Sequence, residues 1–341
     1  MSLTEAVARA AETAPIPDAL TKLGVGFLVG RARRQLDAES PASEALFARD
    51  MTDFPIAEAT DAANAQHYEV PAAFFALCLG ARKKYSSCLY PVADTTLDEA
   101  EEIALAETCA HAGLADGQAV LELGCGWGSL SLWMAEHYPA SRITAVSNSA
   151  SQREFIEGEA ARRGLANLTV ITADMNDFAT GERFDCIVSV EMFEHMANWR
   201  ALLERVNGWL ADDGRFFMHV FTHRNRPYRF DVTDPDNWIA QHFFTGGIMP
   251  SHGLIRHFPD LFEVEQEWRW SGEHYRRTAM DWLANMDRNG PAVDQVLKAT
   301  YGADWQVWKR RWRIFFLATA GLFGHQGGGV WGVSHYLLKK A

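Results

Sequence analysis

A short run of acidic and imidazole side chains, Glu191-Met-Phe-Glu194-His195, is the most informative chemical segment of the sequence. If the segment turns helically, residues 191, 194 and 195 lie on one face. Two carboxylates beside an imidazole can share protons and supply a general base near neutral pH. The spacing matches neither H-E-x-x-H nor the Glu-x-x-His pair of di-iron bundles, so no metal is expected. An acidic helix start with a capping histidine is the structural alternative.

A second segment with chemical potential is the glycine-rich run at 120–129, VLELGCGWGS. An apolar run that ends in alternate glycines, here Gly124, Gly126 and Gly128, is typical of a buried strand that turns tightly into a helix and lets a ligand approach the backbone. The spacing departs from the G-x-G-x-x-G fingerprint, and no Lys-Ser/Thr follows as in a P-loop. Glu122 favours a ligand with a cationic amino-acid end over a pyrophosphate. An incidental glycine-rich turn is the alternative.

The elements that must position these residues form an alternating pattern from residue 115 onward. Short apolar runs predict strands at 119–123, 142–146, 168–172, 185–190 and 215–220, and helices are expected at 129–138, 152–163 and 201–210. This alternation predicts a parallel sheet that helices cover on both faces, with ligands bound beyond the carboxyl ends of the strands. The five strand ends lead into Gly124–Gly128, Ser147-Asn148, Asp174-Met175, Glu191–His195 and Phe221–His223. We therefore expect one site at this edge of the sheet.

Several polar residues at these strand ends are candidates for binding a nucleoside. Asp174 could hold an adenine amino group with Met175 against the ring, or it could be a helix N-cap. Asn148 and Gln152 replace the carboxylate that many cofactor-binding folds place after the second strand, and an amide could still bind a ribose hydroxyl. His219 is either a base or anion ligand that faces the cleft, or a core histidine whose hydrogen bonds are satisfied.

The rest of the chain divides into three predicted regions. They are an N-terminal helical cap at 1–62, ligand-contacting helices and a loop at 63–114, and the main α/β domain at 115–341 with lid insertions at 223–259 and 272–326. Two late strands at 262–270 and 331–340 complete a mostly parallel sheet of seven strands. The sequence has 12 Trp and 20 Phe, many of them after residue 215. They predict either an apolar substrate pocket with a lid or an aromatic core.

Charge and cysteine content limit the partners. The formal net charge is −12, and the basic clusters at 31–34, 82–84 and 309–313 are short and expected to be solvated, so no nucleic-acid track is predicted. Weak attraction of one cluster to anionic lipid is left open. Five cysteines without a C-x-x-C pair favour a reducing compartment, and we expect a cytoplasmic protein. No signal peptide is indicated, and the longest apolar run, Ile314–Phe323, is too short to span a bilayer.

The glycine-rich run, together with Thr144-Ala-Val-Ser-Asn-Ser and Gln152, resembles class I S-adenosylmethionine-dependent methyltransferases. More closely, the chain resembles the cyclopropane fatty acid synthase superfamily, in particular its coclaurine N-methyltransferase-like branch. The matching motifs run nearly end to end: Ile16-Pro-Asp-Ala-Leu, Tyr85-Ser-Ser, Thr95-Thr-Leu-Asp-Glu-Ala-Glu, Asn148-Ser-Ala-Ser-Gln, Glu191-Met-Phe-Glu-His-Met, Phe243-Phe-Thr-Gly-Gly-Ile-Met-Pro-Ser and Ser334-His-Tyr-Leu-Leu-Lys-Lys. The resemblance implies the Rossmann-like class I methyltransferase fold, with S-adenosylmethionine as methyl donor and S-adenosylhomocysteine as product.

The resemblance also assigns site residues. Beside Glu122, the methyl donor is expected to contact Tyr85, Ser86, Gly124, Gly126, Asn148, Gln152, Asp174 and Met175. In the N-methyltransferase branch, the positions of Glu191, Glu194 and His195 orient an amine and take its proton. In the synthase branch, bicarbonate is the base, and its cage matches Cys88, Glu191, His219, the backbone at Phe221, and Tyr275.

This chain carries both sets of residues, so two acceptors remain. The first is a small amine, which overall similarity favours; the second is the alkene of an unsaturated fatty acyl chain, methylated or cyclopropanated with bound bicarbonate. A protein that binds S-adenosylmethionine without catalysis is the minor alternative. A homodimer and a peripheral contact with lipid are compatible with the sequence.

Overall fold

The computed structural model describes residues 9–40, 42–58, 71–234 and 237–341. Its centre is a seven-stranded sheet made of β1 (Ala119–Leu123), β2 (Arg142–Ser147), β3 (Leu168–Thr172), β4 (Phe184–Val190), β5 (Leu210–His223), β8 (Phe262–Ser271) and β9 (Trp331–Lys340). The strand order is β3-β2-β1-β4-β5-β9-β8. Because β9 is antiparallel to both of its neighbours, the other six strands point the same way. The expected mostly parallel, seven-stranded class I methyltransferase fold is confirmed.

Alternating side chains of the central strands bury both faces of the sheet. Val120 packs with α6 (Leu97–His111) and α7 (Ser129–His137), whereas Leu121 packs on the other face with α9 (Trp199–Trp209). Next to β2, α8 (Ala150–Arg163) covers Ala145 and Val170. Burial on both faces explains why these strands are continuous apolar runs in the sequence.

Side-chain caps fix where three of these helices begin. Thr96 and Glu99 form a capping box before α6, Ser149 accepts the N–H of Gln152 before α8, and Asn198 accepts the N–H of Ala201 before α9. With these caps, α8 and α9 begin at Ala150 and Trp199, before the expected starts at 152 and 201.

One strand is longer than expected. The sequence predicts a strand at 215–220, but β5 runs over Leu210–His223. At its start, Leu210 pairs with Phe184 across a register shift, and at its end the pairing with β9 continues to His223 and Trp331. Pairing with a distant strand therefore extends β5 beyond its apolar segment.

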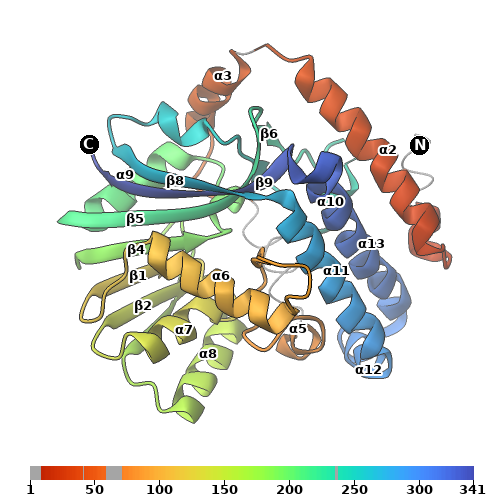
Figure 1. Cartoon of the computed structure of the whole chain (residues 1–341), viewed down its shortest axis with the longest axis horizontal. Coiled ribbons are helices and arrows are strands. Elements are labelled where there is room, and N and C mark those ends of the chain that lie inside the picture. Colours follow the sequence, from red (N-terminus) through yellow and green to blue (C-terminus); the bar gives the residue numbers. More distant parts are fainter. Residues whose placement is uncertain (1–8, 41, 59–70, 235–236) are drawn as a thin grey trace.

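A helical region lies beyond the end of β5, on the right of the sheet in Figure 1. It consists of α2 (Asp18–Asp37), α5 (Ala72–Cys78), α11 (Gly272–Arg288), α12 (Gly290–Tyr301) and α13 (Trp305–Phe323). Aromatic side chains such as Phe75, Trp282 and Trp312 form its core. Most of the late aromatic residues are therefore core, and only some reach the ligand cavity described below.

The segment between β5 and β8 forms smaller elements near the top of the molecule. They are β6 (Tyr228–Arg229), α10 (Trp238–His242), β7 (Ile248–Met249) and the 3-10 helix η4 (Leu254–His257). Of these, η4 packs against α3 (Ser43–Asp50), which also contacts the 3-10 helix η1 (Met51–Asp53). Residues 63–70 of the predicted ligand-contacting region at 63–114 lie outside the described residues.

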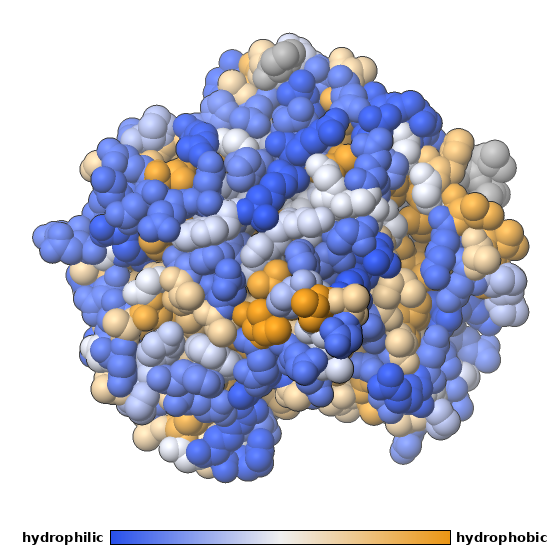
Figure 2. All heavy atoms as spheres, in the orientation of Figure 1, coloured by the Kyte–Doolittle hydropathy of each residue, from blue (hydrophilic) through white to orange (hydrophobic). Residues whose placement is uncertain are grey.

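The face shown in Figure 2 is mainly hydrophilic, with apolar side chains near its centre and at the edge where α2 lies. On that helix Leu20, Leu23 and Phe27 are exposed. In the part of the chain that the structure describes, no helix is both long enough and apolar enough to cross a membrane.

Candidate active site

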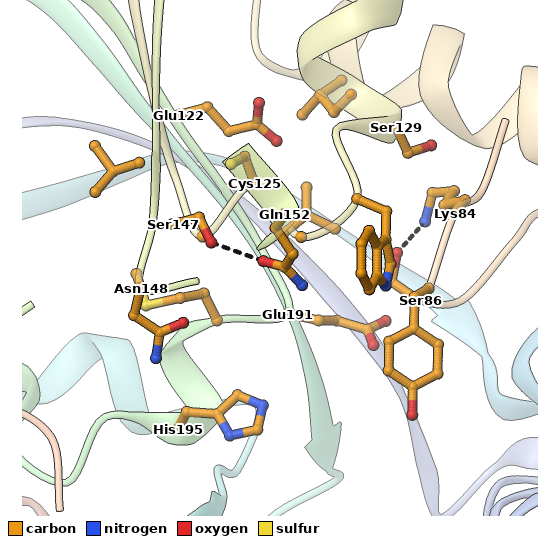
Figure 3. A pocket seen from close by; sticks show the side chains of 18 of the residues that line it. Lys84, Ser86, Glu122, Cys125, Ser129, Ser147, Asn148, Gln152, Glu191 and His195 are labelled. Carbon is orange, nitrogen blue, oxygen red and sulfur yellow. Dashed lines mark hydrogen bonds between the residues drawn. The ribbon is translucent and has the colours of Figure 1, made fainter. Parts of the chain in front are cut away.

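A cavity lies at the carboxyl ends of β1, β2, β3 and β4. The strand order reverses here, with β2 on one side of β1 and β4 on the other, which is where parallel sheets bind ligands. Twelve of the predicted site residues line it: Tyr85, Ser86, Glu122, Gly124, Gly126, Asn148, Gln152, Asp174, Met175, Glu191, His195 and Tyr275. Figure 3 shows Glu122 and His195 at opposite sides of this pocket, with Gln152 and Glu191 between them.

The glycine turn after β1 leaves space for a ligand. Gly124, Gly126 and Gly128 have φ angles of +81°, +51° and +76°, a region that side chains rarely adopt. The turn is held by the N–H groups of Gly124 and Cys125, which both donate to the carbonyl of Val146 at 3.0 Å. A Cβ added at Gly126 would meet no atom of the described chain within 4 Å. The space beside Gly126 is therefore open to a bound molecule.

Glu122, next to the last residue of β1, is a buried carboxylate on the cavity wall. The hydroxyl of Ser131 on α7 donates to it. Burial raises the pKa of Glu122 to about 7, although the bond from Ser131 opposes this. Nearby, Trp127 Nε1 and Ser129 Oγ are buried at the cavity without a hydrogen-bond partner among the described residues. A carboxylate beside unpaired donors fits a ligand that carries both an ammonium and a carboxylate, as the amino-acid end of S-adenosylmethionine does.

The ends of β2 and β3 supply polar side chains on the next part of the wall. Ser147 donates its hydroxyl to Gln152 Oε1 at 2.7 Å, which fixes the amide of Gln152 at the cavity (Figure 3). Asp174 Oδ1 accepts the N–H of Asn176 at 2.7 Å, and Met175 is buried beside it. Asp174 therefore begins a tight turn rather than capping a regular helix. Its place on the cavity wall is compatible with the predicted contact to an adenine.

The loop before α6 brings Tyr85 and Ser86 to the cavity. It is anchored by the buried carboxylate of Glu101, which accepts the backbone N–H groups of Gly80, Arg82 and Lys84. Tyr85 packs its ring against Phe75 and Trp282 at 4.8 and 5.5 Å between centroids.

Lys84 corrects the expectation that the basic cluster at 82–84 is solvated. Only 2% of Lys84 is exposed, and its ammonium donates to Ser86 Oγ at 2.6 Å and to the carbonyl of Ser87 at 2.5 Å. Arg82 pairs with Glu102 and Glu136. Sequence reasoning missed Lys84 as a cavity residue because its burial depends on Glu101, which lies 17 residues further along the chain. The only local signal is its position next to the Tyr-Ser-Ser motif.

Glu191 is the most densely contacted carboxylate of the site. Its oxygens accept the N–H of Ser87 at 2.9 Å and the hydroxyl of Tyr275 at 2.7 Å, and His219 Nε2 lies 3.1 Å from Oε1. Burial raises the pKa of Glu191, while the charge of Lys84 and these hydrogen bonds oppose the rise. The φ of +48° at Glu191 is strained for a residue with a side chain, and such strain gathers at functional sites.

The three residues of the Glu-x-x-Glu-His run do not share one face. Only Phe193–His195 forms a short 3-10 helix, and Glu191 precedes it in a left-handed conformation, so the expected single helical face is wrong. His195 lines the cavity, with its ring stacked on Phe244 at 4.4 Å between centroids.

Glu194 lies behind this wall and is fully buried. Its Oε1 accepts the N–H of Phe221 at 2.6 Å, and its Oε2 has no partner among the described residues. Burial raises the pKa of Glu194 well above its ordinary value, and the charge of Glu191 adds to this.

Two other residues of the predicted bicarbonate cage contact Glu191. Tyr275 donates to Glu191 from α11, and His219 approaches it from β5. Cys88 is buried next to Ser87, where its N–H donates to Thr278 Oγ1 at 3.0 Å. Burial raises the pKa of the Cys88 thiol, so this thiol is a poor nucleophile. Neither Cys88 nor His219 is on the cavity wall.

Comparisons with known proteins agree with this geometry. The family described as "Mycolic acid cyclopropane synthetase" matches residues 57–327. The (S)-coclaurine N-methyltransferase of Thalictrum flavum subsp. glaucum is 35% identical over 335 residues, covering 95% of this chain and 92% of the relative. The cyclopropane-fatty-acyl-phospholipid synthase of Escherichia coli K12 is 28% identical over 270 residues, covering 79% of this chain and 66% of that protein.

Among solved structures, coclaurine N-methyltransferase bound to N-methylheliamine and SAH superimposes with a TM-score of 0.93 and 32% identity, covering 99% of this chain and 100% of that chain. The match includes the sheet and the glycine turn as well as the helical region beyond it. Together, the family match, the relatives and the cavity show that the chain belongs to the mycolic acid cyclopropane synthetase family and is an S-adenosylmethionine-dependent methyltransferase.

Proposed function

We propose that the protein methylates a small amine, with Glu191 holding the amine and His195 taking its proton. The observation that carries the proposal is the position of Glu194. Its carboxylate accepts the Phe221 N–H, the backbone donor that a bicarbonate cage would use. His219 and Tyr275, two other groups of that cage, contact the carboxylate of Glu191. The chain's own carboxylates thus take up the Phe221 N–H and the Tyr275 hydroxyl, and Glu191 also contacts His219.

Electrostatics favour a cationic or neutral amine over an added anion. A bicarbonate ion would have to enter a buried space beside the carboxyl groups of Glu191 and Glu194, where burial already disfavours negative charge and raises the pKa of both groups. An amine N–H is attracted by the same carboxylates. Aromatic rings at the cavity wall, Phe244, Trp282 and Phe315, can pack against the apolar body of such an amine and against its charge.

The chemistry divides between positioning and proton removal. When bound, S-adenosylmethionine supplies an electrophilic methyl group, which is displaced from sulfur as the acceptor nitrogen forms its bond to carbon. Glu191 orients the amine because its carboxylate lies on the cavity wall. Tyr275 and Ser87 hold that carboxylate in place. His195 accepts the proton that the nitrogen loses, because an imidazole can take a proton near neutral pH. Positioning of both partners contributes the larger part of the rate.

Alkene methylation remains the second candidate because His219 and Tyr275 contact Glu191, and Cys88 follows Ser87, whose N–H donates to the same carboxylate. The two candidates differ in their need for bicarbonate and in the product. The test incubates the purified protein with methyl-labelled donor, an amine panel that includes cyclic secondary amines, and vesicles with unsaturated acyl chains. Mass spectrometry reads the products, with and without bicarbonate depletion.

We expect methylated amine, no mass change in the acyl chains, and no effect of depletion. The variant His195→Ala should lower kcat by about 10²–10⁴ while binding of S-adenosylhomocysteine is kept. The control variant His257→Ala, whose imidazole pairs with Glu44 away from the cavity, should leave kcat unchanged. Activity that disappears on bicarbonate depletion, together with labelled lipid, would show that the acceptor is an alkene.

A further inference from the structure

A line of side chains connects the buried carboxylate of Glu191 with the surface. Its members are Glu191, His219, His335, His111 and Glu107. His219 Nε2 lies 3.1 Å from Glu191 Oε1, and the rings of His219 and His335 are 4.5 Å apart between centroids. His335 Nδ1 lies 2.9 Å from His111 Nδ1, and His111 Nε2 lies 3.1 Å from Glu107 Oε1.

The line leads from full burial to solvent. His219 and His335 are 0% exposed, whereas the side chains of His111 and Glu107 are 11% and 43% exposed. Only the inner end belongs to the proposed catalytic site. His335, His111 and Glu107 lie outside the cavity wall and have no part in the chemistry proposed above.

The sheet and α6 place these residues together. His219 on β5 and His335 on β9 are directly opposite in the antiparallel register, so their side chains point to the same face of the sheet. His111 is the last residue of α6, which packs on that face, and its ring stacks on Trp268 at 3.8 Å between centroids. Trp270 and Phe217 flank the ring of His335. Aromatic walls therefore surround the imidazoles and restrict water.

The hydrogen bonds define which nitrogens carry protons. If His111 donates its Nε2–H to Glu107, its Nδ1 presents a lone pair, and His335 must donate through Nδ1–H. His335 Nε2 then has a lone pair. Among the described residues neither His335 Nε2 nor His219 Nδ1 has a hydrogen-bond partner. These two unpartnered nitrogens belong to the adjacent rings, so the line has a single gap, between His219 and His335.

We propose that this line of imidazoles carries the proton that methyl transfer releases. The proton travels from Glu191, at the inner end of the line, to Glu107 at the surface. The inference rests on the proposed function for its source, since the proton of the acceptor must leave a buried site. The proton that His195 takes from the amine crosses the cavity, which both residues line, to the Glu191 carboxylate. Protonated Glu191 then donates to the bare Nε2 of His219, and His219 releases its Nδ1–H to His335 Nε2 through one water. His335 then passes its Nδ1–H to His111 Nδ1, and His111 passes its Nε2–H to Glu107, which returns it to solvent.

One proton enters and one leaves, and each ring ends with its N–H on the other nitrogen. Return of each N–H to its first nitrogen resets the line. Among the described residues, His219 Nδ1 and His335 Nε2 have no hydrogen-bond partner that would oppose this return.

The surrounding charges keep the imidazoles neutral, as a relay requires. Burial lowers the pKa of His219 and of His335, and the charge of Lys84 lowers both further. Burial also lowers the pKa of His111, although Glu107 opposes this. A neutral imidazole carries one N–H and one lone pair, so it can accept on one side and donate on the other. Among the described residues no group of three or more His, Cys, Asp or Glu could hold a metal ion.

The test uses the variants His335→Gln and His111→Gln, with His137→Gln as the matched control. His137 also stacks on a tryptophan, Trp133, but it lies outside the line. Steady-state rates are measured with whichever acceptor the labelled donor reveals, at low buffer concentration and then with added imidazole. Thermal melting checks folding, and His111→Gln changes a ring at the partly exposed end, so it tests the line even if His335→Gln unfolds.

We expect kcat to fall about five- to twentyfold in both relay variants, with KM values unchanged, a larger solvent isotope effect, and recovery on adding imidazole. The control should keep the wild-type kcat. Nitrogen-15 NMR of the histidines should show His335 neutral and protonated at Nδ1. A folded His111→Gln protein with the wild-type kcat and isotope effect would overturn the relay, as would a loss that imidazole does not restore. An alkene acceptor would overturn the proposed amine but not the relay, because that reaction also releases one proton.

Discussion

Three buried carboxylates surround the ligand cavity, and each has a different set of partners. Glu122 accepts the hydroxyl of Ser131, and Glu191 accepts the Ser87 N–H and the Tyr275 hydroxyl and contacts His219 Nε2. Glu194 accepts one backbone N–H, and its other oxygen has no partner among the described residues. Burial raises the pKa of all three. When a cation binds beside a carboxyl group that burial keeps protonated, the carboxyl group loses its proton. The protonation of these residues therefore depends on what the cavity holds.

Glu122 gives a testable pH dependence for donor binding. Its pKa is raised to about 7, so below that pH the free protein holds it protonated and above it the carboxylate is charged. The ammonium of the donor prefers the charged form, so affinity for S-adenosylhomocysteine should rise by roughly tenfold between pH 6 and pH 8. Below pH 7, binding should release a proton, which titration calorimetry in two buffers of different ionisation enthalpy detects.

The variant Glu122→Gln provides the comparison for that measurement. It keeps a polar side chain beside Ser131 but cannot ionise, so its affinity should be lower at pH 8 and should vary little with pH. An equally steep pH dependence in Glu122→Gln would assign the effect to another group.

At the scale of elements, a single carboxylate organises the loop at 80–87. Glu101 of α6 accepts the N–H groups of Gly80, Arg82 and Lys84 at 2.9, 2.6 and 3.2 Å. The loop then presents Tyr85 and Ser86 to the cavity and Ser87 N–H to Glu191. Glu101, which is not on the cavity wall, therefore positions ligand-binding and catalytic groups from behind them.

Glu101→Gln should loosen this loop. The amide has one acceptor oxygen and brings an NH₂ group toward backbone donors, so we expect unfolding stability to fall by roughly 2–3 kcal/mol. The KM for the donor should rise because Tyr85 and Ser86 lose their fixed position. Thermal melting and initial rates measure the two effects. Glu102→Gln, whose side chain is 45% exposed, is the control and should cost less than about 1 kcal/mol. Equal effects of the two variants would contradict the anchoring role.

The strands of the sheet were predictable because strands that are buried on both faces are continuous apolar runs in the sequence. The runs at 119–123 and 168–172 are strands with those bounds in the structure, and their ends meet at one cavity as expected. The glycine turn was also predictable, since its φ angles require glycine. Local patterns could not reveal features that depend on distant partners. These are the burial of Lys84, whose backbone N–H bonds to Glu101, and the hydrogen bond that Glu194 accepts from Phe221. The resemblance supplied the residue set, and only the fold shows which carboxylate faces the cavity.

At the scale of the whole molecule, the sheet holds the donor end of the cavity and the segments after β5 close the other end. Phe244 follows α10, and Phe315 lies in α13; both line the cavity. The N-terminal segment joins these two distant insertions through Glu12. Its carboxylate accepts Trp238 Nε1 at 2.6 Å and pairs with His242 and Arg311 at 3.1 Å each. We infer that Glu12 holds α10 and α13 in fixed positions relative to each other at the acceptor end of the cavity.

Glu12→Ala should therefore loosen α10 and α13 together while the sheet is unaffected. Burial alone would raise the pKa of Glu12, but hydrogen bonds from His242, Arg311 and Trp238 outweigh it and lower the pKa to about 2. Because the folded pKa lies below the ordinary value, the contribution to stability is complete above about pH 4.5 and is lost only as pH falls toward 2.

At neutral pH, hydrogen exchange should accelerate in both helices of the variant. The KM for the acceptor should rise several-fold while affinity for S-adenosylhomocysteine is unchanged, since the donor contacts lie on the sheet. Glu157→Ala, which breaks an exposed pair with Arg153 on α8, should change neither quantity. Faster exchange in α13 alone would mean that Glu12 holds one insertion and that α10 is fixed by its own packing.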